Sequence, residues 1–155
     1  KPGRVDLVLD GRHHGSMASP RTGAEYGIAS NGAGEDEGMA AMAVGAGALR
    51  DEDVLEALGT GLYVGNLHYL NFSDRAGGRV TGMTRFATFW VENGRIAAPV
   101  NVMRWDDTLY RMLGDSLEAL TDRPQWILDS GTYGQRSVQT SRVPGALLRK
   151  MAFTL

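Results

Sequence analysis

Two long central stretches of this chain alternate apolar and polar side chains with a period of two, and this pattern constrains the fold more than any other. They run over residues 62–73 and 79–92, and the second ends at Asn93-Gly94. A period of two is typical of half-buried β-strands, and Asn-Gly is the strongest short signal for a tight hairpin turn. The centre of the chain is therefore predicted to be antiparallel sheet, with one long strand in each stretch.

Shorter patterns predict the elements that precede these strands. Alternation on both sides of Asp10-Gly11 predicts a hairpin over residues 5–17. Residues 19–38 are rich in glycine and acidic side chains and are predicted to form a loop, whereas the small residues of 39–47 indicate a strand packed closely against another backbone. Acidic residues at 51–53 predict the start of a short helix, which glycine at position 59 ends.

The C-terminal part of the chain is predicted to return to the sheet. A third strand covers residues 96–102, with Pro99 at an edge or a bulge, and Asp106 with Asp107 is predicted to cap a helix that ends at Gly114. Leu117 and Leu120 indicate a second helical piece. Val138, the turn at Pro144-Gly145 and residues 147–155 predict a closing hairpin. We expect one α+β domain over residues 1–155, mainly an antiparallel meander of sandwich-like or barrel-like form with two or three short helices.

Composition excludes several classes of function. Sixteen basic and eighteen acidic residues leave a formal charge of −2, which provides no field to attract nucleic acid. The absence of cysteine removes disulfides, thiolate nucleophiles and thiolate metal sites. No apolar run is long enough to span a membrane and no secretory leader is visible, so we expect a soluble, cytoplasmic protein without a nucleic-acid or membrane partner. The first residue is Lys1 rather than methionine, and we expect a piece of a longer polypeptide.

No catalytic device is visible in the residues themselves. His13 and His14 are neighbours in a predicted strand, where adjacent side chains point to opposite faces and do not chelate one metal together. No histidine has the helical spacing of a zinc hydrolase, and no serine occupies a glycine-flanked nucleophile turn. The glycine-rich residues 27–38 lack the lysine of a phosphate loop.

Polar and cationic side chains nevertheless gather in the two central strands. Asn66 and His68 share a face of the first strand, and Arg75, Arg79, Thr84 and Arg85 surround the glycine-rich turn into the second. The arginines admit two interpretations. They pair internally with Asp74, Glu92 or Asp106, or they hold the carboxylate of a ligand by paired hydrogen bonds.

Four motifs in this region resemble the TldD/PmbA family. They are Gly-Thr-Gly-Leu-Tyr-Val at 59–64, Tyr-Leu-Asn-Phe-Ser-Asp-Arg at 69–75, Arg-Val-Thr-Gly-Met-Thr-Arg-Phe at 79–86 and Phe-Trp-Val-Glu-Asn-Gly at 89–94. The resemblance extends through Pro99-Val100, Leu109-Tyr110 and Leu120-Thr121 to Pro144-Gly145 and the last three residues. It implies the C-terminal domain of a TldD-related protein. Such proteins are described as peptidases that act on unfolded or flexible peptides, and also as modulators of DNA gyrase.

The resemblance also implies which part of the parent protein carries the catalytic residues. Catalytic members carry a His-Glu-x-x-x-His helix upstream of this region, and some add a cysteine at a position that falls here near Tyr133 to Arg136. This chain has neither element, so zinc is implied only for a full-length catalytic relative, and we expect this piece alone to be inactive. Its implied role is one wall of a peptide-binding cleft, to which an extended peptide adds as a strand. The residues proposed to bind it are Asn66, His68, Arg75, Arg79, Thr84 and Arg85.

The resemblance leaves other roles open. The implied partners are the protein's own N-terminal domain and further subunits in a homo- or hetero-oligomer. As an alternative, the chain is part of a non-catalytic partner or assembly subunit in a TldD/PmbA-type complex. A direct role in modulating gyrase is disfavoured by the near-neutral charge.

Overall fold

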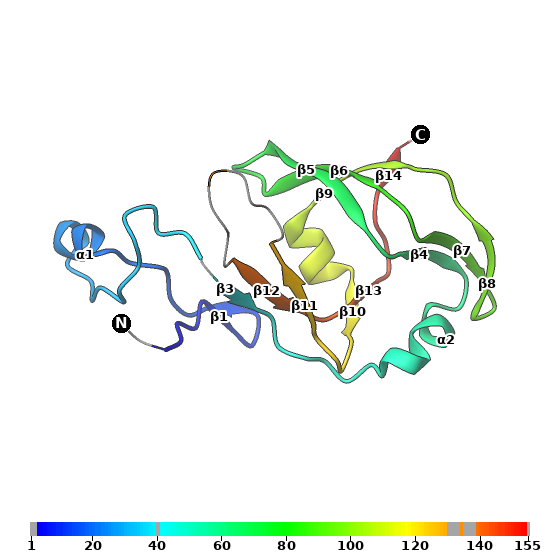
Figure 1. Ribbon diagram of the computed structural model, residues 1–155, viewed down its shortest axis with the longest axis horizontal. Coiled ribbons are helices and arrows are strands. Elements are labelled where there is room, and N and C mark those ends of the chain that lie inside the picture. Colours follow the sequence, from blue (N-terminus) through cyan, green and yellow to red (C-terminus); the bar gives the residue numbers. More distant parts are fainter. Residues whose placement is uncertain (1–2, 40, 130–133, 135–138, 155) are drawn as a thin grey trace. The chain divides into compact units, whose positions relative to one another are not determined.

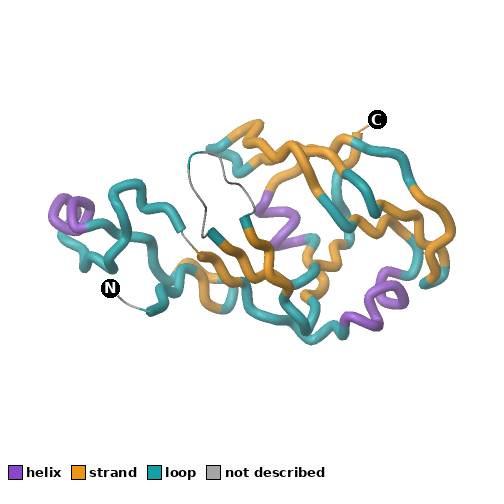
Figure 2. The backbone as a smooth tube through the Cα atoms, in the orientation of Figure 1, coloured by secondary structure: helices purple, strands orange, loops and turns teal. Residues whose placement is uncertain are grey.

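The computed structural model describes residues 3–39, 41–129, 134 and 139–154 (Figure 1). Strands predominate over short helices (Figure 2). Nearly all pairs of strands in the described residues are antiparallel. The prediction of an α+β fold built mainly from antiparallel sheet is confirmed. None of the sheets in the described residues closes into a barrel. No helix in this part of the chain is both long and apolar enough to cross a membrane.

The chain divides into two compact units. The first comprises Lys1–Ala43 and Trp126–Arg142, and the second comprises Val44–Gln125 and Val143–Leu155. The first unit begins with a hairpin of β1 (Val8–Leu9) and β2 (Arg12–His13). Asp10 and Gly11 form its turn with φ angles of 50° and 72°, as a two-residue turn with both central residues left-handed requires. This hairpin was predicted, although its strands are shorter than expected.

The prediction of a loop over residues 19–38 is wrong at its start, where Pro20–Tyr26 form helix α1. Ser19 caps this helix by accepting a hydrogen bond from the backbone N–H of Thr22 at 3.2 Å. Pro20 supplies a fixed φ in the first turn, and Gly27 ends the helix in the left-handed conformation. The high glycine content of the segment hid these start and stop signals.

The rest of the first unit is a small sheet. Its strand order is β11 (Gln125–Leu128), β12 (Thr140–Val143) and β3 (Ala41–Ala43), and β3 runs parallel to β12. A strand near Met42 was therefore predicted correctly. Val138, with which the closing hairpin was predicted to begin, lies outside the described residues. Pro144-Gly145 separates β12 from β13 (Ala146–Leu148), but these two strands belong to different sheets, so the predicted closing hairpin is wrong.

The second unit begins with the predicted short helix. Asp51–Asp53 form a 3₁₀ turn (η1) that leads directly into α2 (Val54–Leu58), and Gly59 ends it with a φ of 64°. Leu55 and Leu58 are half-buried, as expected for its inner face. Upstream, Gly47 lies so close to another backbone that an added Cβ would sit 2.1 Å from the carbonyl oxygen of Leu120.

Each of the two long strands predicted in the centre is in fact two strands. The first consists of β4 (Gly61–Val64) and β5 (Leu67–Asp74), and the second of β6 (Arg79–Thr84) and β7 (Thr88–Glu92). β5 and β6 pair in one sheet, whereas β4 and β7 pair in another. Both strands therefore change sheet at the same point.

Backbone hydrogen bonds hold these two bends together. The N–H of Gly65 donates to the carbonyl oxygen of Ala87 at 2.9 Å, and the N–H of Arg85 donates to that of Asn66 at 3.1 Å. Ala87 has a φ of 57°, a left-handed conformation that is uncommon for a residue with a Cβ. The alternation of side chains continues across such a bend, so the sequence pattern alone does not reveal it.

The hairpin at Asn93-Gly94 forms as predicted. It joins β7 to β8 (Arg95–Pro99), with φ angles of 49° and 74° at the two turn residues. β8 is the last strand of the order β4-β7-β8, so Pro99 lies on an edge strand, where its missing N–H leaves no gap in the ladder.

The two helix predictions in the C-terminal half differ in outcome. A helix that ends near Gly114 does form, over residues 109–110 and the π-helix Arg111–Asp115 (η2), but Asp106 and Asp107 do not cap it because they lie within strand β9 (Arg104–Thr108). Thr108 directly precedes it, and its Oγ1 accepts a hydrogen bond from the N–H of Arg111 at 3.2 Å. Leu117–Leu120 form strand β10, because pairing with β13 outweighs their helical propensity.

The C-terminus enters the sheet as predicted. β14 (Phe153–Thr154) pairs with β9 and gives a four-stranded sheet in the order β14-β9-β6-β5. A hydrophobic cluster of Val80, Trp105 and Met112 lies against this sheet, with Leu109, Leu148, Met151 and Phe153 packed around it. Strand β5 is thus the outer strand of the sheet that covers the main core.

Candidate functional site

The exposed edge of the four-stranded sheet is the most distinctive surface of the second unit. Strand β5 pairs with β6 on one side and is the last strand in the sheet order. All eight of its side chains are exposed, and they include Tyr69 (76 %), Leu70 (58 %) and Phe72 (51 %). Long apolar edge strands are unusual in soluble proteins because unpaired backbone groups beside apolar side chains invite pairing with another chain.

A bulge interrupts β5 near its middle. Tyr69 has a φ of 54°, and the register with β6 shifts between His68 and Asn71 and again between Phe72 and Asp74. Bulges of this kind bend an edge strand and redirect its side chains, and they are over-represented next to functional sites.

The six predicted site residues fall on or next to this edge, but they do not form one constellation. His68 is exposed on β5, and Arg85 follows the end of β6 with its guanidinium nitrogen Nη1 3.4 Å from His68 Nδ1. Half-buried Asn66 is joined to them through its backbone carbonyl, which accepts the N–H of Arg85. These three residues do come together.

The other three predicted residues lie elsewhere. Arg75, in the turn after β5, places its guanidinium carbon 5.9 Å from the centre of the Phe72 ring. Thr84 is buried at 1 % exposure, and its Oγ1 accepts the N–H of Met103 at 3.0 Å, so its side chain is part of the structure. Arg79 forms an ion pair with Asp106, with Nε 2.5 Å from Oδ1. Asp106 is one of the three internal partners considered from the sequence.

Arg75 and Arg85 differ from Arg79 in their electrostatic surroundings. In the part of the chain that the structure describes, no carboxylate lies within ion-pair distance of either side chain. Both are exposed and both lie against an aromatic ring, since the guanidinium of Arg85 is 5.2 Å from the centre of the Phe86 ring. Such contacts orient an arginine while leaving its hydrogen-bond donors free.

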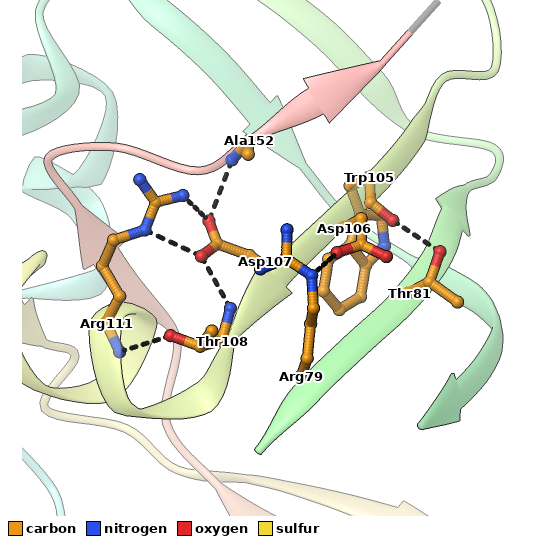
Figure 3. Close-up of polar contacts among 8 residues, drawn as sticks. All are labelled: Arg79, Thr81, Trp105, Asp106, Asp107, Thr108, Arg111 and Ala152. Carbon is orange, nitrogen blue, oxygen red and sulfur yellow. Dashed lines mark hydrogen bonds and ion pairs between the residues drawn. The ribbon is translucent and has the colours of Figure 1, made fainter. Parts of the chain in front are cut away.

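A buried carboxylate, Asp107, holds the opposite edge of the same sheet together (Figure 3). Asp107 is 2 % exposed, and its Oδ1 accepts Arg111 Nε at 2.8 Å and the N–H of Thr108 at 2.7 Å. Its Oδ2 accepts a second guanidinium nitrogen of Arg111 and the N–H of Ala152 at 3.0 Å. Asp107 on strand β9 thus binds both the π-helical turn and the segment before β14.

Burial by itself raises the pKa of Asp107, but the hydrogen bonds from Arg111, Ala152 and Thr108 together outweigh burial and lower that pKa below its ordinary value. The side chain is therefore held ionised and fully paired. A carboxylate in this state suits a structural role, because a general base needs a free lone pair and a pKa nearer neutrality. The sequence shows only an Asp-x-x-x-Arg spacing and no sign of the distant partner Ala152.

Trp105 is the second buried group that the sequence did not reveal. Its indole is 2 % exposed, and Nε1 has no hydrogen-bond partner among the described residues. A Cβ added to Gly82, its cross-strand neighbour, would lie 2.8 Å from Nε1 and 2.8 Å from Leu70 Cδ2. The glycine therefore leaves room for the indole to extend beneath Leu70 of the exposed edge strand.

The described residues do not offer a metal site. No three side chains of the His, Cys, Asp and Glu types converge there. His13 and His14 lie in the first unit. The position near Tyr133 to Arg136 falls almost entirely outside the described residues.

The first unit carries a separate open hollow of about 340 Å³ beside β3, β11 and β12. Apolar side chains line one part of it and polar side chains the rest: Met39, Met42, Ile127, Leu128, Asp129, Gln139, Thr140 and Ser141. Its lining among the described residues has no lysine, arginine or histidine that would orient an anionic ligand.

Solved structures of longer proteins share this fold. The structure of TldE from Thermococcus kodakarensis matches with a TM-score of 0.78 and 16 % sequence identity, covering 96 % of this chain and 33 % of that protein. A putative modulator of a DNA gyrase from Thermotoga maritima matches with a TM-score of 0.73 and 15 % identity, covering 96 % and 32 % respectively. This chain thus corresponds to about one third of the length of each.

The fold is therefore that of a β-rich domain which also occurs within longer proteins. A family model described as the PmbA/TldA metallopeptidase C-terminal domain matches residues 1–155, and the chain belongs to that family. No curated protein sequence matches the chain.

Proposed function

We propose that this domain forms one wall of a peptide-binding cleft in a TldD/PmbA-type protein and holds an extended peptide along strand β5. The observation that carries the proposal is the eight-residue edge strand with every side chain exposed. We assign chemistry on the bound peptide to other parts of the parent protein, because no three His, Cys, Asp or Glu side chains converge among the described residues.

Strand addition suits a peptide of variable sequence. The N–H groups of β5 that point away from β6 donate hydrogen bonds to any extended backbone, and the C=O groups on that side accept them. Tyr69, Leu70 and Phe72 offer apolar contact area to the side chains of the incoming strand. Affinity then depends mainly on the peptide backbone, which is what a binder of unfolded or flexible peptides requires.

The pattern of backbone hydrogen bonds provides a direct test. A fluorescent ten-residue unstructured peptide is prepared in two further forms, N-methylated at alternate residues or at every residue, and binding to the chain is followed by fluorescence anisotropy. An added strand directs only alternate N–H groups toward β5, so we expect the alternately methylated form to bind like the parent peptide through its free edge, and the fully methylated form to lose about tenfold or more in affinity. Equal affinity of the parent and the fully methylated peptide, or no binding of the parent peptide, would contradict the proposal.

A matched pair of variants locates the binding edge. Phe72 on β5 and Ile96 on the edge strand β8 are 51 % and 52 % exposed. We expect Phe72→Ser to weaken peptide binding about three- to tenfold and Ile96→Ser to leave it unchanged, since both remove similar apolar area but only one lies on the proposed edge. The reverse result would assign peptide binding to the other sheet.

The role of the parent protein is tested separately. Metal content of the full-length protein is measured by elemental analysis, and peptide cleavage is assayed with and without chelator. Stoichiometric zinc with chelator-sensitive cleavage would make this domain the cleft wall of a working metallopeptidase. Metal-free, inactive protein that still binds peptide would favour the alternative of a non-catalytic partner subunit.

A further inference from the structure

Arg85 projects from a backbone position that is fixed on both sides. Its N–H donates to the carbonyl oxygen of Asn66 at 3.1 Å, and its own carbonyl oxygen accepts the hydroxyl of Thr88 at 3.0 Å. The neighbouring Gly65 N–H bonds to Ala87 at the same bend. The side chain thus starts from a rigid junction between two sheets, although its guanidinium is exposed.

The contact between Arg85 and His68 favours one tautomer of the imidazole. Arg85 Nη1 lies 3.4 Å from His68 Nδ1, and a guanidinium only donates hydrogen bonds. A hydrogen bond at this contact therefore makes Nδ1 the acceptor, with the ring proton on Nε2. The pair consequently presents the remaining guanidinium N–H groups and the Nε2–H, all of them donors.

Aromatic rings hold both members of the pair in place. The guanidinium carbon of Arg85 lies 5.2 Å from the centre of the Phe86 ring, and the His68 ring meets Tyr69 edge-on at 4.7 Å between centres. These contacts reduce the number of rotamers that must be ordered when a ligand binds. They also place apolar surface next to the donors.

No described carboxylate neutralises this pair, in contrast to Arg79 with Asp106 and Arg111 with Asp107. We infer that Arg85 and His68 form a carboxylate-binding subsite at the start of strand β5. A carboxylate offers two acceptor oxygens, which match two donors of a guanidinium or one donor each from guanidinium and imidazole.

This inference rests on the proposed function, because the subsite lies beside the edge strand to which the peptide adds. The ligand group is either an Asp or Glu side chain of the peptide or its C-terminal carboxylate. Both sources present the same chemistry, and the experiment separates them.

Three versions of one extended peptide provide the first arm. The first is neutral with a C-terminal amide, the second has a free C-terminal carboxylate, and the third has an internal Gln→Glu change with the amide retained. We expect the second or the third to bind about three- to tenfold more tightly than the first in low salt, with the difference reduced in 0.5 M salt. Which of them gains affinity identifies the source of the carboxylate.

Two variants connect this preference to the pair. Arg85→Gln should abolish the preference for the carboxylate-bearing peptide, and Arg95→Gln should retain it, since Arg95 is an exposed arginine on β8. An equal affinity of all three peptides, or a preference that survives Arg85→Gln, would overturn the inference and leave the proposed strand addition intact.

A second arm does not depend on peptide binding. The histidine ring signals of the chain are followed by NMR during titration with N-acetylglutamate methylamide, and N-acetylglutamine methylamide is the control. We expect the His68 signals, assigned from a His68→Gln variant, to shift with the acid alone, and those of His13 and His14 to stay unchanged. If the His68 signals shift but the chain binds no peptide, the proposed function is refuted and the subsite is supported. If the His68 signals do not shift selectively with the acid, the subsite is refuted.

Discussion

The carboxylate of Asp107 accepts a hydrogen bond from the backbone N–H of Ala152 at 3.0 Å, across 45 positions of sequence. This bond joins strand β9 to the segment that leads into the C-terminal strand β14. The same carboxylate is bound by Arg111 from the π-helical turn. One side chain therefore connects strand β9 to the π-helical turn and to the segment before β14, and β9 belongs to the sheet whose outer strand is the proposed peptide edge.

Replacing Asp107 by Asn should destabilise the chain by about 2–3 kcal/mol, because the amide keeps the volume but loses the charge and one acceptor for buried donors. Unfolding in urea, followed by tryptophan fluorescence, measures the difference. Glu118→Gln is the control, since it breaks the exposed pair with Arg149 and should leave the midpoint unchanged. Equal stability of Asp107→Asn and the parent chain would show that the network contributes little.

The Asp107 network also predicts how stability depends on pH. Although burial raises its pKa, the hydrogen bonds lower it overall, so the folded chain binds this proton less readily than the unfolded chain. The contribution of Asp107 is fully present above about pH 4 and is lost as the pH falls below that value. The difference in urea midpoint between the parent chain and Asp107→Asn should therefore shrink between pH 5 and pH 3. A constant difference would contradict the lowered pKa.

Gly47 and Gly45 provide a second matched pair. A Cβ on Gly47 would lie 2.1 Å from the Leu120 carbonyl oxygen, whereas nothing lies within 4 Å of one on Gly45. Gly47→Ala should cost about 3 kcal/mol or more, since the contact is with backbone and cannot be relieved by a rotamer change. Gly45→Ala should be neutral in the same urea titration. Similar stability of the two variants would show that the bridge between Leu49 and Thr121 yields easily.

Local signals in the sequence were sufficient for features that depend on neighbouring residues. Asn93-Gly94 and Asp10-Gly11 form the hairpins that they predict, because the turn conformation depends on the turn residues themselves. The helix between residues 51 and 58 likewise follows from its acidic start and its glycine stop. Pairing of β5 with β6 also brings the predicted residues His68 and Arg85 together.

Features that depend on distant partners could not be predicted. The bends in the two central strands arise from the contact of Gly65 with Ala87, which leaves the apolar-polar alternation undisturbed. Leu117–Leu120 have helical propensity and become a strand only through pairing with β13. Asp107 resembles a helix cap in sequence, and its true role requires Ala152.

The pairing of Arg79 with Asp106 leads to a further prediction about the site. Their side chains are 48 % and 28 % exposed, and the contact is an ion pair without an aligned hydrogen bond. A double-mutant cycle with Arg79→Ala and Asp106→Ala should give a coupling energy of about 0.5–1 kcal/mol, as expected for a partly exposed pair.

The Arg79→Ala variant also distinguishes a structural role of Arg79 from a role in peptide binding. If Arg79 serves only the sheet, Arg79→Ala will lower stability by this small amount and leave the affinity for the extended peptide unchanged, whereas Arg85→Ala will weaken binding of a peptide that carries a carboxylate. Coupling near zero together with weaker peptide binding in Arg79→Ala would reverse this assignment. Arg79 would then be a ligand-binding residue, and its contact with Asp106 would be incidental.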